Sequence, residues 1–319
     1  MNVPLMRPLT PDDMVALCGL INLANAHDGL RISKDVDEVR EDIGPPTLEL
    51  GDDTLGAFIG GDLVGAVWVH YLPAEVVNER CYVFGAVHPG HRRLGIGRQL
   101  MAWGVSRADA LLATGTNELP KYVCSSATEG ADDARRLFAR FGLEPVRYFD
   151  DLVMPLTDIA PAPVIPGIDI VAWPVERSAE IHAVKNTAFA SHWGSTPTND
   201  ETWEQIAGGF GSRPDLSFVA LDADGHIVAL LLSYRYEADD EVLGSSQGYI
   251  DKIATLPEWR EHGIARALIL TALHRFREEG LTQAALDVDS DSPTGANRLY
   301  TSIGFTPRSR SITFRTSAR

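Results

Sequence analysis

Apolar and polar positions follow two different periods along the chain, and their alternation predicts a protein of mixed helices and strands. From Thr10 to Asn25 apolar residues recur at helical spacing behind a threonine suited to cap a helix. Residues 54–71 instead contain two short strands around Gly60, Gly61 and Asp62, a pattern typical of a hairpin. Further strands are predicted at 81–88, 121–127 and 145–156, and further helices at 95–113 and 131–142.

The second half of the chain repeats this order of elements. A helix is predicted at 175–190 and a hairpin at 215–237, with Asp224 and Gly225 at its turn. Beyond the hairpin, strands are predicted at 247–255, 284–289 and 311–315, and helices at 263–279 and 294–304. Each half is therefore expected to be an α/β unit with a mixed sheet.

Two short motifs recur in the same order in both halves, at offsets of 168 and 162 residues. The aligned positions are Arg92, Gly95 and Gly97 with Arg260, Gly263 and Ala265, and Phe138, Gly142 and Pro145 with Tyr300, Gly304 and Pro307. A repeat of this length indicates a duplicated domain and not a solenoid unit. Because the proline-rich stretch from Pro155 to Gly167 resists helix formation, we predict domains at 1–157 and 167–319 with a linker at 158–166.

Composition narrows the class of partner. The 319 residues include 44 acidic and 28 basic side chains, a net charge of −16 that disfavours nucleic acid and anionic membrane surfaces. The N-terminal residues lack the apolar core of a secretion signal, so the protein is expected in the cytoplasm. Cys18, Cys81 and Cys124 are odd in number and widely spaced, which predicts reduced cysteines and neither a disulfide framework nor a metal site.

The first motif lies where a predicted strand gives way to a helix, and its spacing suits an anion. Small residues in Arg-x-x-Gly-x-Gly allow a sharp turn that leaves backbone N–H groups bare at the positive end of the helix dipole, beside an arginine. A pyrophosphate is the expected ligand. A Rossmann fingerprint would need glycine at Leu100, and the Gly-Lys-Ser/Thr of a P-loop is absent. The alternative is that the glycines only terminate a strand–helix turn.

These residues resemble the GNAT superfamily of N-acetyltransferases, whose acetyl-CoA loop is Gln/Arg-x-x-Gly-x-Gly/Ala after the fourth strand. A later helix of the family carries a tyrosine shortly before Gly-Phe, as Tyr300 precedes Gly304 and Phe305 here. The resemblance covers both halves, and the layout is similar to that of mycothiol synthase and related bacterial tandem acetyltransferases. It implies an α/β (α+β) fold of two tandem GNAT-type domains, each a mixed, largely antiparallel twisted sheet flanked by helices.

The resemblance also implies acetyl-CoA (CoA) as the cofactor, with its pantetheine along the fourth strand and its pyrophosphate on the turn. The strand residues are Ile253, Ala254 and Thr255, and Ala86, Val87 and His88. The turn residues are Arg260, Glu261, His262, Gly263, Ile264, Ala265 and Arg266, and Arg92, Arg93, Leu94, Gly95, Ile96, Gly97 and Arg98. Glu261 and His262 weaken the attraction for phosphate, so the first turn is expected to bind the anion more strongly. Asn297 is expected to substitute for a family asparagine whose position is Ser292 here.

Acetyl transfer needs a base for the amine and an acid for the thiolate. Tyr300 matches the family's acid, whereas the equivalent Phe138 has no proton to donate, so the N-terminal domain is expected to bind CoA without catalysis. Asp251 is the expected base. It neighbours Lys252 on a strand, so the two side chains are predicted to point to opposite faces. A salt-bridge role for Asp251 is the alternative, and Glu237, Asp287 and Asp289 are the other carboxylate candidates.

The acceptor site is expected in residues 189–205, which follow the first helix of the second half. His192, Trp193 and Trp203 there could shape a pocket, together with Glu237 and Asp287, although aromatic residues at such spacing also pack helix pairs.

The predicted function is acetyl transfer to a primary amine of a small molecule by direct attack in a ternary complex. The alternatives are a non-catalytic acyl-CoA sensor and an acetyltransferase acting on a protein or peptide amine. Both a monomer and a homodimer are compatible with this prediction.

Overall fold

In the computed structural model the chain is described except for residues 1–2, 45–47, 74–76, 191–196, 292–294 and 319. It forms two compact units, residues 1–148 with 311–319 and residues 149–310. The chain passes between the units inside two strands, β6 (Glu144–Pro155) and β12 (Thr306–Ser317). The units thus differ from the consecutive halves that the repeat suggests, because each half contributes the end of a strand to the other unit's sheet. Residues 158–166 contain no helix or strand.

The first unit is built on a mixed sheet in the order β1-β2-β3-β4-β5, completed by residues 311–317 of β12. Strands β4 and β5 are parallel, and the other pairs are antiparallel. The elements are β1 (Leu5–Arg7), α1 (Met14–His27), α2 (Val36–Asp42), α3 (Leu50–Asp53), β2 (Thr54–Ile59), β3 (Asp62–Leu72), β4 (Glu79–Val87), α4 (Ile96–Thr114), β5 (Lys121–Thr128) and α5 (Asp132–Arg140).

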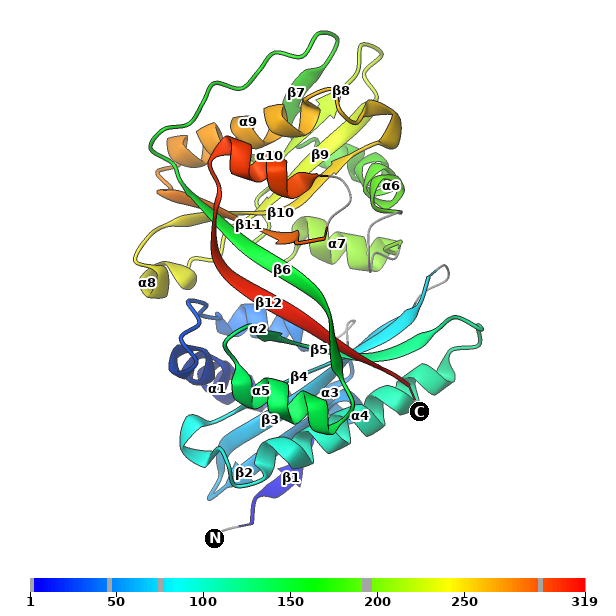
Figure 1. The fold of residues 1–319 in the computed structure, drawn as a ribbon, viewed down its shortest axis with the longest axis vertical. Helices are drawn as coiled ribbons and strands as arrows, with labels where there is room; N and C mark the ends of the chain where they lie inside the picture. The colour runs from blue at the N-terminus through cyan, green and yellow to red at the C-terminus, as the bar shows by residue number, and fades with distance from the viewer. Residues whose placement is uncertain (1–2, 45–47, 74–76, 191–196, 292–294, 319) are drawn as a thin grey trace. The chain divides into compact units, whose positions relative to one another are not determined.

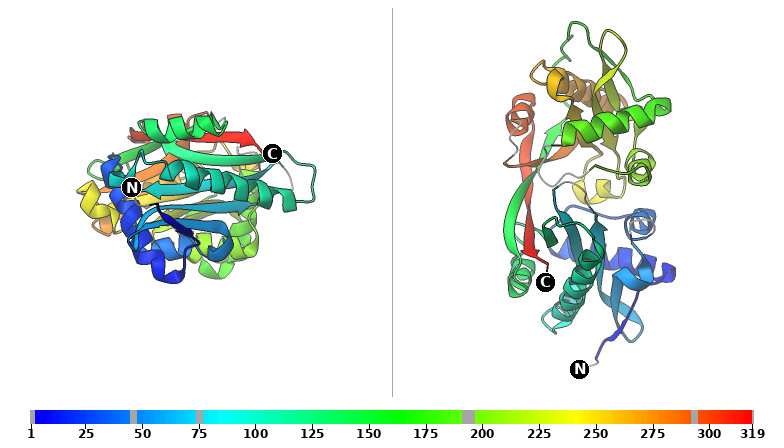
Figure 2. Two further views of the ribbon diagram at one scale, coloured as in Figure 1. Left: turned by 90° about the horizontal axis from the view of Figure 1, so that it is seen from below. Right: turned by 90° about the vertical axis from the view of Figure 1, so that its right-hand side faces the viewer.

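Two apolar clusters cover the two faces of this sheet. Helix α4 packs on one face, and α1 with α2 packs on the other (Figure 2). Gly104 allows α4 to approach β4 closely, since a Cβ there would lie 2.5 Å from a Val83 methyl carbon. Ile312 and Phe314 of β12 are 3% and 4% exposed within the α4 cluster. Residues far along the sequence therefore complete the core of the first unit.

The second unit repeats this arrangement in the order β7-β8-β9-β10-β11, with residues 149–155 of β6 paired to β11 (Figure 1). Its elements are β7 (Asp169–Ala172), α6 (Ser178–Phe189), α7 (Asp200–Gly208), β8 (Phe218–Leu221), β9 (Ile227–Tyr234), α8 (Asp239–Leu243), β10 (Gln247–Thr255), α9 (Ile264–Glu278), β11 (Gln283–Asp289) and α10 (Ala296–Ile303). Strand β9 is buried along its whole length. We call the side of this sheet covered by α9 and α10 the α9 face, and the side covered by α6 and α7 the α6 face.

Every helix and strand predicted from the sequence is present, and the α/β fold with a mixed sheet in each unit is confirmed. The short helices α2, α3, α7 and α8 were not predicted. The three cysteines are buried and free, as predicted. Among the described helices, none is both long enough and apolar enough to cross a bilayer.

The position of Phe314 predicts that the first unit depends on the end of β12. We expect Phe314→Ala to lower the free energy of unfolding of that unit by about 3–5 kcal/mol, because it empties a packed site. Amide hydrogen exchange of β5 and α4, followed with urea unfolding, measures the effect. Val164→Ala is the control, since Val164 is 92% exposed. Unchanged protection of β5 in Phe314→Ala would contradict the prediction.

Candidate functional site

The turns after β4 and β10 have the same unusual backbone. Arg93 and Gly95 have φ angles of 64° and 88°, and Glu261 and Gly263 have 65° and 81°. Within the described ranges, Arg93 and Glu261 are the two non-glycine residues with positive φ, and they occupy equivalent positions of the repeat. Left-handed residues at alternate positions of a turn direct backbone N–H groups toward one concave side, an arrangement suited to anions.

The helices that follow these turns begin without a side-chain cap. Gly95 precedes α4 and Gly263 precedes α9, and neither helix start receives a side-chain hydrogen bond. Ile96 and Ile264 are buried, so each helix start is anchored by its first apolar residue. The first N–H groups of an uncapped helix lack intrahelical acceptors and lie at the positive end of its dipole. Both turns therefore offer backbone donors to an anion.

The arginines that open the two motifs have a positioning role. Arg92 donates to the Val87 carbonyl and forms a two-point ion pair with Asp28 at the end of α1. Arg260 donates to the carbonyls of Thr255 and Ala188, the latter in the last turn of α6. Each arginine thus ties the turn to its strand and to the first helix of its unit, which holds the backbone amides of the turn in place.

Strands β10 and β11 pair only at their beginnings. Their parallel register runs from Gln247 with Gln283 to Tyr249 with Ala285, although β10 continues to Thr255 and β11 to Asp289. We call the segments 250–255 of β10 and 286–289 of β11 the parted segment. In the first unit β4 and β5 part in the same way after Tyr82 and Cys124. Backbone groups on the facing edges of β10 and β11 therefore have no strand partner among the described residues and are available to an extended ligand, whereas in the first unit the Ser125 hydroxyl donates a 2.8 Å hydrogen bond to the Val83 carbonyl of β4.

Asp251 interrupts the pairing of β10 with β9. The register shifts between Ile250 and Lys252, which makes Asp251 the extra residue of a β-bulge. The expectation that Asp251 and Lys252 point to opposite faces is therefore wrong: Lys252 Nζ lies 2.6 Å from Asp251 Oδ2, and both are on the α6 face. A bulge breaks strict alternation, which is the physical reason. The β3–β4 register in the first unit shows no such shift.

Tyr300 lies on the other side of the sheet. It projects from α10 into the apolar cluster of the α9 face, where it is 9% exposed and meets the Phe305 ring edge-on. Burial raises the pKa of Tyr300 to about 12, so the phenol keeps its proton at neutral pH. Its hydroxyl has no hydrogen-bond partner among the described residues. Phe138, its counterpart in the first unit, packs against Phe314.

Asp287 extends from β11 to the α6 face, opposite Leu286 and Val288 in the α9-face cluster. The Tyr249 hydroxyl donates a 3.0 Å hydrogen bond to its carboxylate. Asp287 is exposed to solvent, and neighbouring protein groups desolvate its carboxylate in part. Desolvation is the largest cause that raises the pKa of Asp287 to about 6. The charge of Asp151, which lies directly opposite Asp287 on the neighbouring strand β6, adds to it.

Lys185 is a buried cation of α6 on the same face. Its ammonium donates to Asn186 and Thr198 at 3.1 Å each and forms no ion pair with a described carboxylate. Burial, followed by the charge of Lys252, lowers the pKa of Lys185 to about 8.

Several other predicted residues make contacts within the fold or lie on its surface. Trp203 is buried, stacks on His182 and donates to Ser178, so it packs α7 on α6. Asn297 donates to the carbonyls of Asp289 and Ser290, which steadies the β11–α10 connection. Glu237 is exposed in the loop after β9. His192, Trp193 and Ser292 lie outside the described residues.

The remaining predicted cofactor residues differ in exposure. Glu261 and His262 are exposed, and His262 contacts the Arg260 carbonyl through Nδ1. Arg266 donates to Ser302 of α10, and Arg93 pairs with Asp133 at the start of α5. Arg98 and Leu94 are exposed. The first turn has more arginines than the second, although Arg92 and Arg93 are paired with Asp28 and Asp133, and its stronger binding of the anion stays a prediction.

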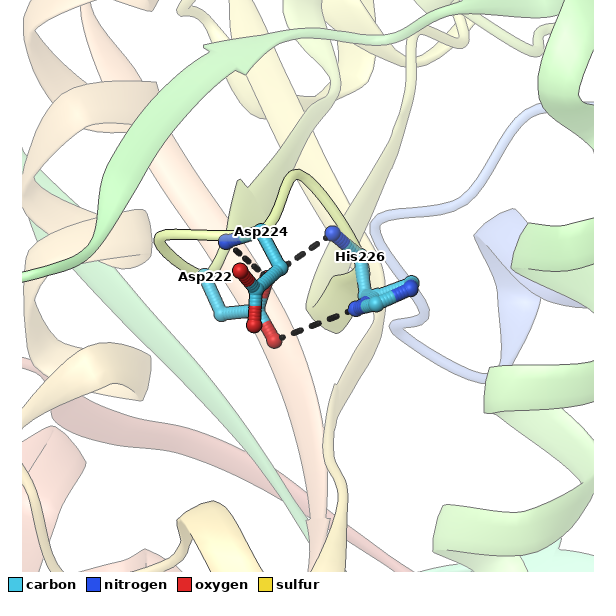
Figure 3. Close-up of side chains that lie close together, drawn as sticks. All are labelled: Asp222, Asp224 and His226. Carbon is cyan, nitrogen blue, oxygen red and sulfur yellow. Dashed lines mark hydrogen bonds and ion pairs between the residues drawn. The ribbon is translucent and has the colours of Figure 1, made fainter.

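One cluster of potential metal ligands lies in the β8–β9 hairpin. Asp222, Asp224 and His226 place one ligand atom each within 4.8 Å of the others (Figure 3). Asp222 accepts the backbone N–H groups of Asp224 and His226, so its carboxylate already closes the turn. The cluster is accounted for as turn structure.

Sequence reasoning missed three residues on the α6 face. Tyr249 and Asp151 come beside Asp287 through the registers of β10 and β6 with β11, and Lys185 of α6 interacts with the charges of Lys252 and Asp251 on β10. An aromatic residue in a strand and a lysine in a helix give no local sign of such a site. A cross-strand register could have found Asp151, but β6 belongs to the other half of the repeat.

Comparisons with known proteins agree with this geometry. The model of the acetyltransferase (GNAT) family matches residues 27–143 and again residues 179–305. A mycothiol acetyltransferase of Thermobispora bispora is 30% identical over 307 residues, covering 93% of this chain and 94% of that protein. One of Tsukamurella paurometabola is 31% identical over 253 residues, covering 73% of this chain and 77% of its own.

Solved structures show the same fold. A GCN5-related N-acetyltransferase from Sphaerobacter thermophilus superposes with a TM-score of 0.77 at 26% identity, covering 99% of this chain and 96% of that one. A tandem GNAT protein from the clavulanic acid biosynthesis pathway gives a TM-score of 0.74 at 20% identity, covering 99% of both chains. The tandem GNAT resemblance predicted from the two turns and from Tyr300 is confirmed.

The burial of Lys185 predicts a pH-dependent stability. Its pKa of about 8 in the fold lies below the ordinary 10.5, so the penalty for burying the charge is complete below pH 8. It is relieved as pH rises from 8 to 10.5, where only the unfolded chain binds the proton.

We expect Lys185→Met to raise the free energy of unfolding at pH 7 by about 1–3 kcal/mol, and the gain to shrink at pH 10. Urea unfolding of both proteins at the two pH values measures this. A stability difference independent of pH would contradict the prediction.

Proposed function

The chain belongs to the acetyltransferase (GNAT) family and carries the domain twice, and from that premise we propose that its second unit transfers an acetyl group from acetyl-CoA to a primary amine of a small molecule. The observation that carries this proposal is the parted segment, which ends at the uncapped turn before α9 and has Tyr300 on one face and a carboxylate on the other.

The described residues fit an acyl-CoA. The turn amides around Gly263 suit a diphosphate, and the edge of Ile253 to Thr255, which no described strand pairs with on the β11 side, suits the amide groups of an extended pantetheine arm. The negative charge of Glu261 lowers the electrostatic attraction of the turn for phosphate. The backbone N–H groups can still donate hydrogen bonds to phosphate oxygens, because these donors do not depend on the side chains. In this arrangement the thioester would lie where β10 and β11 begin to separate, just beyond Tyr249 and Ala285, with the α9 face on one side and the α6 face on the other.

Tyr300 is proposed as the acid that protonates the departing thiolate. Its high pKa keeps the phenol protonated at neutral pH, and its hydroxyl has no competing acceptor among the described residues. A strand N–H at the parting would polarise the acetyl carbonyl as its charge develops. Asp251, the carboxylate first predicted as the base, is engaged by Lys252.

The first unit is proposed to bind CoA without transferring the acetyl group. Its turn has the same backbone and more basic side chains, which supports binding. Phe138 has no proton to donate, and β4 lacks the bulge that brings Asp251 to the α6 face. Where β10 has charged residues, β4 has Phe84, which stacks with Trp68 and Tyr82. A regulatory acyl-CoA site in this unit is therefore the second candidate function.

A small-molecule acceptor is supported by the relatives named mycothiol acetyltransferase, which match along both units. A protein or peptide amine is the competing acceptor. Assaying release of CoA thiol with a panel of small primary amines and with basic peptides separates the two classes.

Tyr300→Phe is expected to lower kcat for CoA release by ~10²-fold or more, because it removes the proton for the leaving thiolate. Calorimetric CoA affinity should change little, since the ring remains. Phe138→Tyr is the matched variant, and it should leave kcat unchanged. Full kcat in Tyr300→Phe at all pH values would show that Tyr300 is not the acid.

Gly263→Ala and Gly95→Ala are expected to weaken CoA binding in the second and the first unit respectively. Alanine at a positive φ costs about 1–2 kcal/mol, and relaxing that strain would misalign the amides, so Kd should rise about 10-fold or more. Gly280→Ala provides the control, since its φ of 81° imposes the same strain at the far end of α9. Titration calorimetry resolves the sites, and equal heats in all three variants would argue against the turns as CoA sites.

A further inference from the structure

We propose that Asp287, held by Tyr249 beside the parted segment, is the base that accepts a proton from the acceptor amine. The inference rests on the proposed function and names the proton acceptor of that reaction. Asp287 on β11 and Tyr249 on β10 lie at the point where the parallel pairing of these strands ends. An amine bound there would lie on the α6 face, across the sheet from Tyr300.

The hydrogen bonds of Asp287 leave one oxygen free. Its Oδ2 accepts the Tyr249 hydroxyl at 3.0 Å, and its Oδ1 accepts none from the residues that the structure describes. Tyr249 itself is fixed by its ring, which meets the ring of Tyr236. The tyrosine therefore orients the carboxylate while one oxygen remains open to an incoming ammonium group.

Neighbouring carboxylates are already paired. Asp251 contacts Lys252, Asp151 accepts from Arg308 and Ser309, and Asp150 forms a two-point pair with Arg310. Asp289, one alternate position farther along β11, is 3% exposed and accepts the backbone N–H of Asp291. Asp287 is the carboxylate of this group that solvent reaches and that has no ion-pair partner among the described side chains.

The charges around Asp287 poise it for proton exchange near neutral pH. Asp151 of β6 and Asp251 of β10 raise its pKa, and Arg308 of β12 and the Tyr249 hydrogen bond lower it. Desolvation is the largest effect, and the pKa of Asp287 is about 6 as a result. A base with this pKa is ionised at pH 7 and still basic enough to take a proton from an ammonium group.

The reaction balances with these two residues. The ammonium passes one proton to Asp287, and the free amine attacks the thioester carbonyl. As the C–N bond forms and the C–S bond breaks, Tyr300 protonates the thiolate. The new amide nitrogen sheds its second proton, which restores the Tyr300 phenol through solvent, and Asp287 releases its proton to solvent. One ammonium and one thioester thus yield one amide, one thiol and one proton.

The test is the pH profile of kcat/KM for CoA release with an amine that the wild-type chain acetylates. The wild type should lose activity as pH falls through about 6. Asp287→Asn should lower kcat/KM by ~10²-fold or more and remove this limb. Tyr249→Phe should shift the limb to higher pH, because the carboxylate loses a hydrogen bond that favours its charged form. Asp151→Asn should shift it to lower pH, because a like charge is removed.

Asp224→Asn in the exposed β8–β9 hairpin is the matched control, since it removes the same formal charge. It should change neither kcat/KM nor the pH at which kcat/KM falls. A second readout needs no substrate: in the full chain with ¹³C-labelled aspartate carboxyls, one resonance should titrate near pH 6 and be missing from Asp287→Asn. The assignment would be overturned if Asp287→Asn kept both the wild-type kcat/KM and its loss at acidic pH. It would also be overturned if no carboxyl resonance of the wild type titrated near pH 6. A chain that releases CoA with no amine would overturn the proposed function itself.

Discussion

The parting of two parallel strands is the constraint on which the rest of the second unit depends. Parallel neighbours in a sheet ordinarily satisfy each other's backbone groups, and β10 and β11 give up that pairing beyond Tyr249 and Ala285. The unpaired edge can be tolerated only where another extended molecule or water supplies the missing partners. Three features surround this edge: the uncapped turn after β10, Tyr300 on the α9 face and Asp287 on the α6 face. Their proposed roles depend on the absence of a strand partner there.

The two units show that one backbone can be retained while its chemistry changes. Both turns keep the same positive-φ residues, and both parallel pairs part at equivalent tyrosines, Tyr82 and Tyr249. Around the first, aromatic rings stack, and Phe138 occupies the position of Tyr300. Around the second, a bulge gathers charged groups. In the proposed function, binding of the diphosphate relies on the backbone and can survive such divergence, whereas proton transfer relies on particular side chains and cannot.

Local features of the fold could be predicted from the sequence, and features set by distant pairing could not. Glycine spacing and apolar periods were sufficient for the turns and for the helices after them, and the resemblance of the two motifs to those of a known family indicated the family. The bulge at Asp251 has no local signature, so the alternation rule placed Asp251 and Lys252 on opposite faces. The contact of Tyr249 with Asp287 depends on a register between strands that a helix separates in the sequence, and Asp151 arrives from the other half of the chain. Sequence periodicity carries no information on such pairings.

The exchanged strand ends also affect how the chain is made. During synthesis, residues 1–148 emerge first, but the outer edge of β5 has no native neighbour until residues 311–317 have been translated. An unsatisfied strand edge of this kind invites association with other nascent chains. Residues 1–148 leave the ribosome before the rest of the described chain, and they would therefore need protection by chaperones for the longest time.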